Sequence, residues 1–433
     1  MDTPGAQNHR WWLCLGVVCG GALLLRLGVI FWLDPSRHVG GDPFQYHYGA
    51  NFLVEGRGFI DASSYLFKNQ VRQSAQHPPL YSLVLAIPSA LGLRSVLAHQ
   101  LFSCLIGTGT VAVVGVVGRR IAGPTVGLIA ACLAAVYPNM WLFEGLLYSE
   151  TLTLLTTSLT LLAAYRFWDR RDGRTAAELG VACALAALTR GEAVLFLPLI
   201  VVPWVLLARQ PRPPRRLGLA LVAAVAAGLT MMPWTVFNLA RFRYPVPVAD
   251  DLGITLAGAN CENTYGGQYI GYFGYTNKCI PDLPAVSGAD ETDDAHYYQS
   301  AGLRYLRAHR SRLPAVVLAR EGRTWGFYQP FGQVRIDAYL ESRNLTAAKW
   351  GLVMYWMMAV AAVAGAVVLR RRQVPLSPLI ALFVTVAVTV AVTYGETRFR
   401  ASAEPALVLL SAVAFYRASV WIWSRLLPLF VER

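Results

Sequence analysis

Charged residues, and lysine above all, are scarce in this chain of 433 residues. Only 15% of the residues are charged, whereas a soluble protein of this length carries roughly 25%. Three of the 38 basic residues are lysines, and the others are arginines. The sequence also lacks internal repeats, low-complexity tracts and a glycine motif of the nucleotide-binding kind. These absences argue against an ordinary soluble enzyme.

Hydrophobic residues make up 55% of the chain, and the mean hydropathy is +0.43. Apolar runs long enough to cross a bilayer recur along the sequence. The first run, 11–33, is too long for the core of a signal peptide and lacks a cleavage site with small residues. It therefore predicts a retained span, and the whole pattern predicts an all-α polytopic membrane protein.

The net charge of +13 would suit a nucleic-acid-binding protein, but its distribution points elsewhere. Arginines cluster in short loops between apolar runs, which is the positive-inside pattern of cytoplasmic loops. No basic soluble domain remains to hold nucleic acid. The clustered arginines are Arg119, Arg120, Arg170, Arg171, Arg174, Arg212, Arg215, Arg216, Arg370, Arg371 and Arg372.

With those loops inside the cell, about ten spans follow and both termini are cytoplasmic. The predicted spans are 11–33, 97–118, 121–137, 149–167, 175–189, 192–208, 217–236, 350–369, 376–394 and 404–424. The chain then divides into a transmembrane module (1–236) with a first external loop (34–96), an external segment (237–349) and the C-terminal helices (350–433).

Two apolar stretches outside these spans are too short to cross a bilayer. Residues 80–93 number 14 and contain a proline and a glycine, so we expect a juxtamembrane helix on the external side. The stretch 43–55 is similar, because Phe44, Tyr48 and Phe52 share one helical face. Residues 293–328 predict two amphipathic helices, and 250–285 a mixed loop rich in Gly, Asn and Tyr.

Two of the seven cysteines, Cys261 and Cys279, lie in predicted external sequence, and the others lie in predicted spans. A disulfide between them is expected in an oxidising compartment. Two free thiols are the alternative.

The stretch Gly40-Gly41-Asp42-Pro43 follows the first span. Asp before Pro is typical of a helix start, with Asp42 as N-cap and Gln45 as its capping-box partner. A second interpretation makes Asp42 the catalytic carboxylate of a membrane enzyme. The two roles are compatible, because a capping carboxylate stays ionised.

Other polar and ionisable residues gather at the same predicted membrane face. A charge at membrane depth costs roughly 2.5–3.5 kcal/mol on insertion scales, so such residues are usually paired or functional. The alternatives are solvated loop charges and one structural pair between Glu150 and Arg190. The set comprises Asp42, His77, Glu144, Glu150, Arg190, Glu192, Asn238, Arg241, Glu396, Arg398 and Arg400.

A carboxylate at this face is able to take a proton from an attacking hydroxyl. Arginines suit a phosphate through their permanent charge and paired donors. Together they predict a substrate with a lipid tail and a phosphate head.

The ordered motifs resemble those of glycosyltransferases that use polyprenyl-phosphate sugars, the GT-C fold of glycosyltransferase family 39, close to the protein O-mannosyltransferases and the aminoarabinose transferases. The motifs run in the same order over nearly the whole chain. They are Gly41-Asp42 with Tyr46 and Tyr48, His77-Pro78-Pro79-Leu80-Tyr81, Tyr148-Ser149-Glu150-Thr151, Leu188-Thr189-Arg190, Pro233-Trp234 with Asn238, and Glu396-Thr397-Arg398-Phe399-Arg400.

The resemblance implies a role for each matching residue. Asp42 would be the catalytic base, and Glu150 a catalytic helper that orients donor or acceptor. The lipid phosphate would be held by Arg190, Arg398 and Arg400. The substrate-binding residues would be His77, Tyr81, Tyr46, Glu144 and Asn238.

The resulting prediction is an inverting glycosyltransferase of the cell membrane with its active site on the extracytoplasmic side. Its partners would be a polyprenyl-phosphate sugar, membrane lipids and an acceptor hydroxyl on a protein, glycolipid or cell-wall glycan. No metal is required, although Asp42 and Glu150 are able to share a divalent cation. Larger family members carry a further soluble domain, so acceptor recognition is expected from 237–349.

Two other functions fit the same residues. A flippase of a lipid-linked saccharide would use the arginines but need no base, although transporters tend to show repeats and broken helices. A ligase using a diphosphate-linked glycan would differ in its donor. Mannose, arabinose and aminoarabinose all remain open as the transferred sugar.

Overall fold

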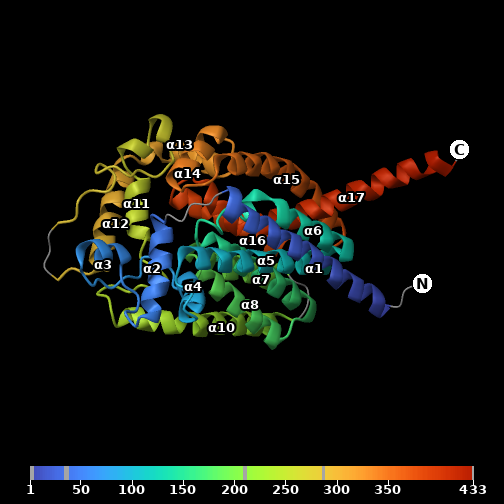
Figure 1. Cartoon of the computed structure of the whole chain (residues 1–433), viewed down its shortest axis with the longest axis horizontal. Helices are drawn as coiled ribbons and strands as arrows, with labels where there is room; N and C mark the ends of the chain where they lie inside the picture. The colour runs from blue at the N-terminus through green and yellow to red at the C-terminus, as the bar shows by residue number, and fades with distance from the viewer. Residues whose placement is uncertain (1–3, 34–38, 208–211, 285–287, 432–433) are drawn as a thin grey trace.

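The computed structural model describes residues 4–33, 39–207, 212–284 and 288–431. Across those residues the chain is helical, and the β pairing is one antiparallel bridge between Ile60 and Gln73. Figure 1 shows an elongated bundle with both termini projecting from one end. The helices α2 (Asp42–Val54), α3 (Ala62–Lys68), α11 (Leu252–Ala259), α12 (Glu291–Ala308) and α13 (Leu313–Thr324) gather at the opposite end.

Every predicted span contains a helix. The long helices have apolar residues on most faces, as expected for helices in a bilayer. They are α1 (Pro4–Gly28), extended by a π-helix (Val29–Leu33), α5 (Val96–Ala122), α6 (Pro124–Val136), α7 (Glu150–Arg170), α8 (Gly173–Ala187), α9 (Phe196–Leu207) after a 3-10 turn (Gly191–Leu195), α10 (Pro213–Leu239), α15 (Leu345–Arg371), α16 (Ser377–Val392) and α17 (Glu404–Val431).

Five helical segments of the described residues are long and apolar enough to cross a membrane by length and composition: 7–33, 96–122, 213–239, 345–371 and 404–424. The protein is therefore a multi-pass membrane protein. Shorter apolar helices fill other predicted spans, so the count of ten stays a prediction. Residues 34–38, where the predicted first external loop begins, and residue 208, the predicted end of the sixth span, lie outside the described residues.

The bundle is built by pairs of neighbouring helices. Helix α5 packs on α6 and α7, α8 packs on α10, and α15 packs on α17. Gly365 of α15 lies so close to the Leu410 carbonyl of α17 that an added Cβ would fall 1.9 Å from that oxygen. Close backbone approach of this kind holds membrane helices together.

Helix α2 (Asp42–Val54) packs against α3 (Ala62–Lys68) and α4 (Leu80–Ala90). The predicted aromatic face of α2 is confirmed, with ring centroids 4.6 Å apart for Phe44 and Tyr48 and 6.3 Å for Tyr48 and Phe52. Helix α4 lies within the expected short stretch 80–93. Its Tyr81 ring meets Tyr46 of α2 edge-on at 5.0 Å.

The predicted capping role of Asp42 is wrong. Gly41 is the N-cap residue, with φ of 58°, and no side chain caps the helix. The Gln45 amide instead donates to Asp61 and accepts from the backbone amide of Ala62 at 2.9 Å. The Asp42 carboxylate has a stronger partner in a guanidinium, and charge-assisted bonds are about twice as strong as neutral ones.

Four α-helices lie wholly within the described part of 237–349, the segment predicted to be external. Two were predicted within 293–328, and they are α12 (Glu291–Ala308) and α13 (Leu313–Thr324). The other two, α11 (Leu252–Ala259) and α14 (Pro330–Leu340), were not expected. A disulfide joins Cys261 to Cys279, so the mixed loop is closed on itself.

Candidate active site

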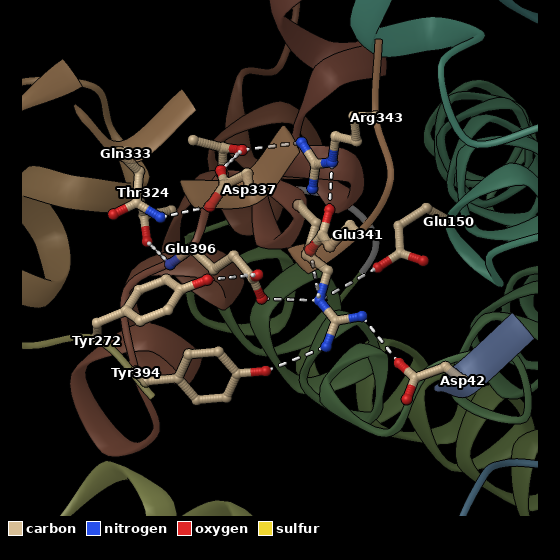
Figure 2. A network of polar contacts seen from close by, with 12 residues as sticks. Asp42, Glu150, Tyr272, Thr324, Gln333, Asp337, Glu341, Arg343, Tyr394 and Glu396 are labelled. Atoms are coloured by element: carbon tan, nitrogen blue, oxygen red, sulfur yellow. Dashed lines mark hydrogen bonds and ion pairs between the residues drawn. The ribbon is translucent and has the colours of Figure 1, made fainter. Parts of the chain in front are cut away.

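Arg398 lies at the centre of a charged network on the 3-10 helix Thr397–Ser402, between α16 and α17. Its Nη1 donates to Asp42 Oδ2 at 2.8 Å, and its Nε donates to Glu396 Oε2 at 2.9 Å. Its Nη2 donates to the Tyr394 hydroxyl at 3.1 Å. Figure 2 shows these side chains converging from both ends of the chain.

Two more carboxylates face the same guanidinium. Glu341 Oε1 lies 3.6 Å from Arg398 Nε, and Glu150 Oε1 lies 4.0 Å from it. Four acidic side chains therefore surround one cation (Figure 2). Burial raises the pKa of the Glu341 carboxyl well above its usual range, against the opposing effect of the nearby Arg343.

Glu150 is fully buried at the first position of α7. A helix N-terminus favours a carboxylate, and Arg190 adds an ion pair through its Nη1. The same guanidinium donates through Nε to Glu192 Oε1 at 2.6 Å. The structural pair considered as an alternative for Glu150 and Arg190 is thus present. The 4.0 Å contact with Arg398 joins it to the larger network.

Asp42 is the accessible member of the network. Its side chain is 35% exposed, whereas that of Glu396 is 2% exposed. Partial burial opposes ionisation of Asp42, but the nearby Arg398 and His77 outweigh it and lower the pKa of the carboxyl to about 2. His77 Nε2 lies 3.8 Å from Asp42 Oδ1. The geometry thus presents an ionised carboxylate with one oxygen held and the other beside an imidazole.

Tyr46 and Tyr81 line the wall behind Asp42. The Tyr46 ring lies 5.0 Å from that of His77. The Tyr81 hydroxyl meets Ser103 at 3.2 Å within the bundle. Tyr46 therefore packs beside the imidazole that faces Asp42, and Tyr81 packs edge-on against Tyr46.

Three predicted site residues make their contacts elsewhere. Glu144 pairs with Arg26 at 2.9 Å, with both side chains buried. Asn238 donates to the Val246 carbonyl at 3.1 Å. Their contacts hold loops and helices in place, and their roles toward a substrate stay predictions.

Arg400, the third of these predicted site residues, lies in a different cluster. It donates to the Thr324 carbonyl at 3.2 Å, pairs with Glu404 at 3.4 Å and lies 3.9 Å from the Tyr355 ring. Arg398 contacts Asp42, whereas the contacts of Arg400 are with this second group. Binding of a lipid phosphate by Arg400 stays a prediction.

Sequence reasoning overlooked Glu341 and Arg343 just before α15. Arg343 pairs with Glu341 and donates to Thr397 Oγ1 at 3.0 Å. Thr397 in turn donates to Asp337 Oδ2. The sequence did offer one sign of these residues, because Glu341 and Arg343 are two opposite charges at the predicted outer end of a span. Their distance in sequence from Arg398 concealed the contact that Glu341 makes with it.

Asp251 was overlooked as well. It is an exposed residue just before α11. Its charge interacts with those of His77, Glu192, Arg190 and Asp42. The segment 237–349 therefore contributes a further acid beside the network.

The two carboxylates predicted to share a divalent cation both face Arg398. The guanidinium donates to Asp42 and lies 4.0 Å from Glu150. Its charge neutralises part of the negative charge that would attract a cation between them.

Comparisons with known proteins bear on the fold. The family model described as dolichyl-phosphate-mannose-protein mannosyltransferase matches residues 76–237. No curated protein matches the chain. Among solved structures, the oligosaccharyltransferase AglB of Archaeoglobus fulgidus, in complex with an inhibitory peptide and a dolichol-phosphate, is 15% identical with a TM-score of 0.56.

The match covers 97% of this chain and 51% of AglB, so the chain spans about half the length of that relative. Another AglB structure, with Zn and sulfate, gives a TM-score of 0.54 at 15% identity, covering 95% of this chain and 50% of AglB. ArnT from Cupriavidus metallidurans gives 0.42 at 14% identity and covers 94% of this chain and 78% of ArnT.

These findings define the class. The chain is a multi-pass membrane protein with the GT-C fold. Within that class it resembles glycosyltransferase family 39, and the segment from the His77 motif to the end of α10 carries the family match.

Proposed function

We propose that the protein transfers a sugar, with inversion, from a polyprenyl-phosphate donor to an acceptor hydroxyl on the extracytoplasmic side of the membrane. The observation that carries the proposal is the 2.8 Å contact between an ionised, accessible Asp42 and Arg398. A proton acceptor and a phosphate-binding cation thereby share one site.

The chemistry follows from those two groups. The acceptor oxygen attacks the anomeric carbon and forms the new glycosidic bond. The bond between that carbon and the phosphate oxygen breaks, and its electron pair leaves with the lipid phosphate. Asp42 takes the hydroxyl proton as general base. Arg398 and Arg190 stabilise the charge that develops on the departing phosphate.

Donor binding would also strengthen Asp42 as a base. Without donor, the carboxyl is a weak base because Arg398 holds its pKa at about 2. A phosphate on Arg398 would offset part of that cationic charge and place a second anion nearby. Both effects raise the pKa of Asp42. Proton transfer is then favoured once the donor is in place.

The comparisons support a lipid-phosphate donor without identifying it. The matching family model is named for a dolichyl-phosphate-mannose donor, and AglB has been seen with a dolichol-phosphate. The arginine-rich loops orient the helices so that the network faces the outside. The transferred sugar is a hexose or a pentose.

A transfer assay on the purified full chain in nanodiscs tests the proposal. Polyprenyl-phosphate mannose, arabinose and aminoarabinose would each be supplied with sugar and peptide acceptors. Release of free polyprenyl phosphate together with an inverted glycoside supports the proposal. Movement of intact donor across the bilayer without release would favour a flippase. Turnover of a diphosphate-linked donor alone would favour a ligase.

A further inference from the structure

A small pocket continues from the active site along α2. The volume of this pocket is about 40 Å³. It lies between α2, α4 and the loop that joins α3 to α4. The lining residues are Gln45, Tyr46, Gly49, Phe59, Ile60, Ser74, Ala75, Gln76, His77, Pro78, Pro79 and Ser82.

The pocket and the catalytic carboxylate share one helical face. Asp42, Tyr46 and Gly49 are spaced i, i+4 and i+7 along α2, so they lie one above the other. His77 lines the pocket and also lies 3.8 Å from Asp42 Oδ1. A molecule bound at Asp42 would therefore reach the pocket past His77 and Tyr46.

Two polar groups of the pocket, on Ser82 and Gln76, are free to bind a ligand. Ser82 is 9% exposed, and its hydroxyl has no hydrogen-bond partner among the described residues. The side-chain amide of Gln76 is likewise unpaired within that part of the chain. Other polar lining groups are occupied, since Ser74 donates to Glu291 Oε1 at 2.7 Å and Gln45 binds α3.

The lining selects an uncharged, hydroxylated group. It holds no acidic or basic side chain other than His77. Phe59, Pro78 and Pro79 supply apolar ring surfaces. One water molecule needs roughly 10–15 Å³ of such space, so the pocket has room for a short arm of about three heavy atoms and not for a whole sugar ring.

We infer that this pocket binds a second hydroxyl-bearing arm of the acceptor, and that the acceptor is therefore a sugar. The inference rests on the proposed function for its acceptor role. A peptide acceptor has its reacting hydroxyl at Asp42 and supplies no further hydroxyl at a fixed distance. A sugar carries several hydroxyls, so one is attacked at Asp42 while another donates or accepts at Ser82 and Gln76.

Gly49→Ala is a sharp test of the pocket. A Cβ on Gly49 would meet only Ser82 Oγ, at 3.6 Å, which is ordinary contact. The substitution therefore puts a methyl group into the pocket without displacing protein atoms, and alanine favours the helix. Gly228→Ala in α10 is the matched control, because nothing lies within 4 Å of a Cβ added at that position. Ser82→Ala removes the free hydroxyl.

The first readout is binding by saturation-transfer NMR to the full chain in nanodiscs without donor, so it does not depend on catalysis. The probes are methyl α-mannopyranoside, its 6-deoxy analogue and a serine-threonine peptide. We expect the mannoside to bind wild type and Gly228→Ala equally, and Gly49→Ala at least tenfold more weakly. Ser82→Ala and the 6-deoxy probe should each lose binding severalfold.

Equal mannoside binding by Gly49→Ala and wild type would overturn the inference, as would absence of saturable mannoside binding to wild type. Peptide binding that Gly49→Ala abolishes would overturn it in favour of a protein acceptor. Pocket-dependent sugar binding without release of lipid phosphate from any donor would instead contradict the proposed function and leave the sugar pocket standing.

Discussion

Arg398 donates a 2.8 Å hydrogen bond to Asp42 although 356 positions separate the two residues in the chain. The bond joins the start of α2 to the turn between α16 and α17, so the first and last thirds of the protein meet at one carboxylate. Glu396 and Tyr394 fix the other edges of the same guanidinium. The site is therefore held by contacts remote in sequence.

The first prediction concerns Asp42→Asn. The amide is close in size to the carboxylate but accepts no proton, so transfer should fall by about 10²–10⁴-fold. Initial rates of lipid phosphate release measure the loss. Asp169→Asn, at an exposed ion pair with Arg120, is the control and should keep wild-type rates. Wild-type turnover by Asp42→Asn would remove this residue from the chemistry.

The second prediction concerns pH. Asp42 has a lowered pKa of about 2, so in wild type its protonation does not reduce kcat/KM above about pH 4. Removing the cation in Arg398→Gln raises that pKa, because burial then acts with less opposition. An acid limb should therefore appear at higher pH in the variant.

The pH profile of kcat/KM between pH 4.5 and 8 measures this shift, and Arg400→Gln is its control. A pH profile of Arg398→Gln that is as flat on the acid side as that of wild type contradicts the electrostatic link between Arg398 and Asp42. The position of the limb is informative even where the rate itself falls.

The third prediction concerns the buried pair of Glu150 and Arg190. Arg190→Gln leaves a fully buried carboxylate with Arg398 as its remaining cation, at 4.0 Å. Removing one partner of a buried pair costs about 3–5 kcal/mol, and Arg398 should hold the loss near the lower value. Glu150→Gln in the same chain should restore part of the stability. Thermal unfolding in nanodiscs measures both; an unchanged midpoint in Arg190→Gln contradicts the pairing.

The fourth prediction concerns the disulfide in the segment 237–349. Cys261 and Cys279 are 18 positions apart and both buried. A bridge closing a loop of this size stabilises by about 3 kcal/mol. Cys261→Ala with Cys279→Ala should therefore speed proteolysis of residues 250–280 while the bundle persists. Equal proteolysis of reduced and oxidised wild type would show that the bridge contributes little.

Much of this architecture was readable from sequence because the bilayer constrains it. A chain in lipid must satisfy its backbone within helices, so apolar runs and arginine loops located the helices closely. The outer ends of those helices also suggested that Asp42 and Arg398 face the same side. The short helices α11 and α14 escaped notice, because neither has a strong amphipathic period.

The contacts within the site were less predictable. Arg398 and Arg400 are two residues apart and looked equivalent, yet the 3-10 turn points one toward Asp42 and the other toward Glu404. The local sequence predicted Asp42 to be a helix cap, but its carboxylate accepts a hydrogen bond from Arg398 instead. The partner of each of these side chains depends on which residue, distant in sequence, the fold brings next to it. The local sequence does not carry that information.

The most direct test of the central claim is a structure of the full chain in nanodiscs with a non-transferable polyprenyl-phosphate sugar. The account predicts the phosphate within about 3 Å of Arg398 nitrogens, with the anomeric carbon facing Asp42 and the lipid tail running into the bundle. A phosphate bound elsewhere, with the Asp42 and Arg398 pair unchanged and out of reach of the sugar, would contradict it.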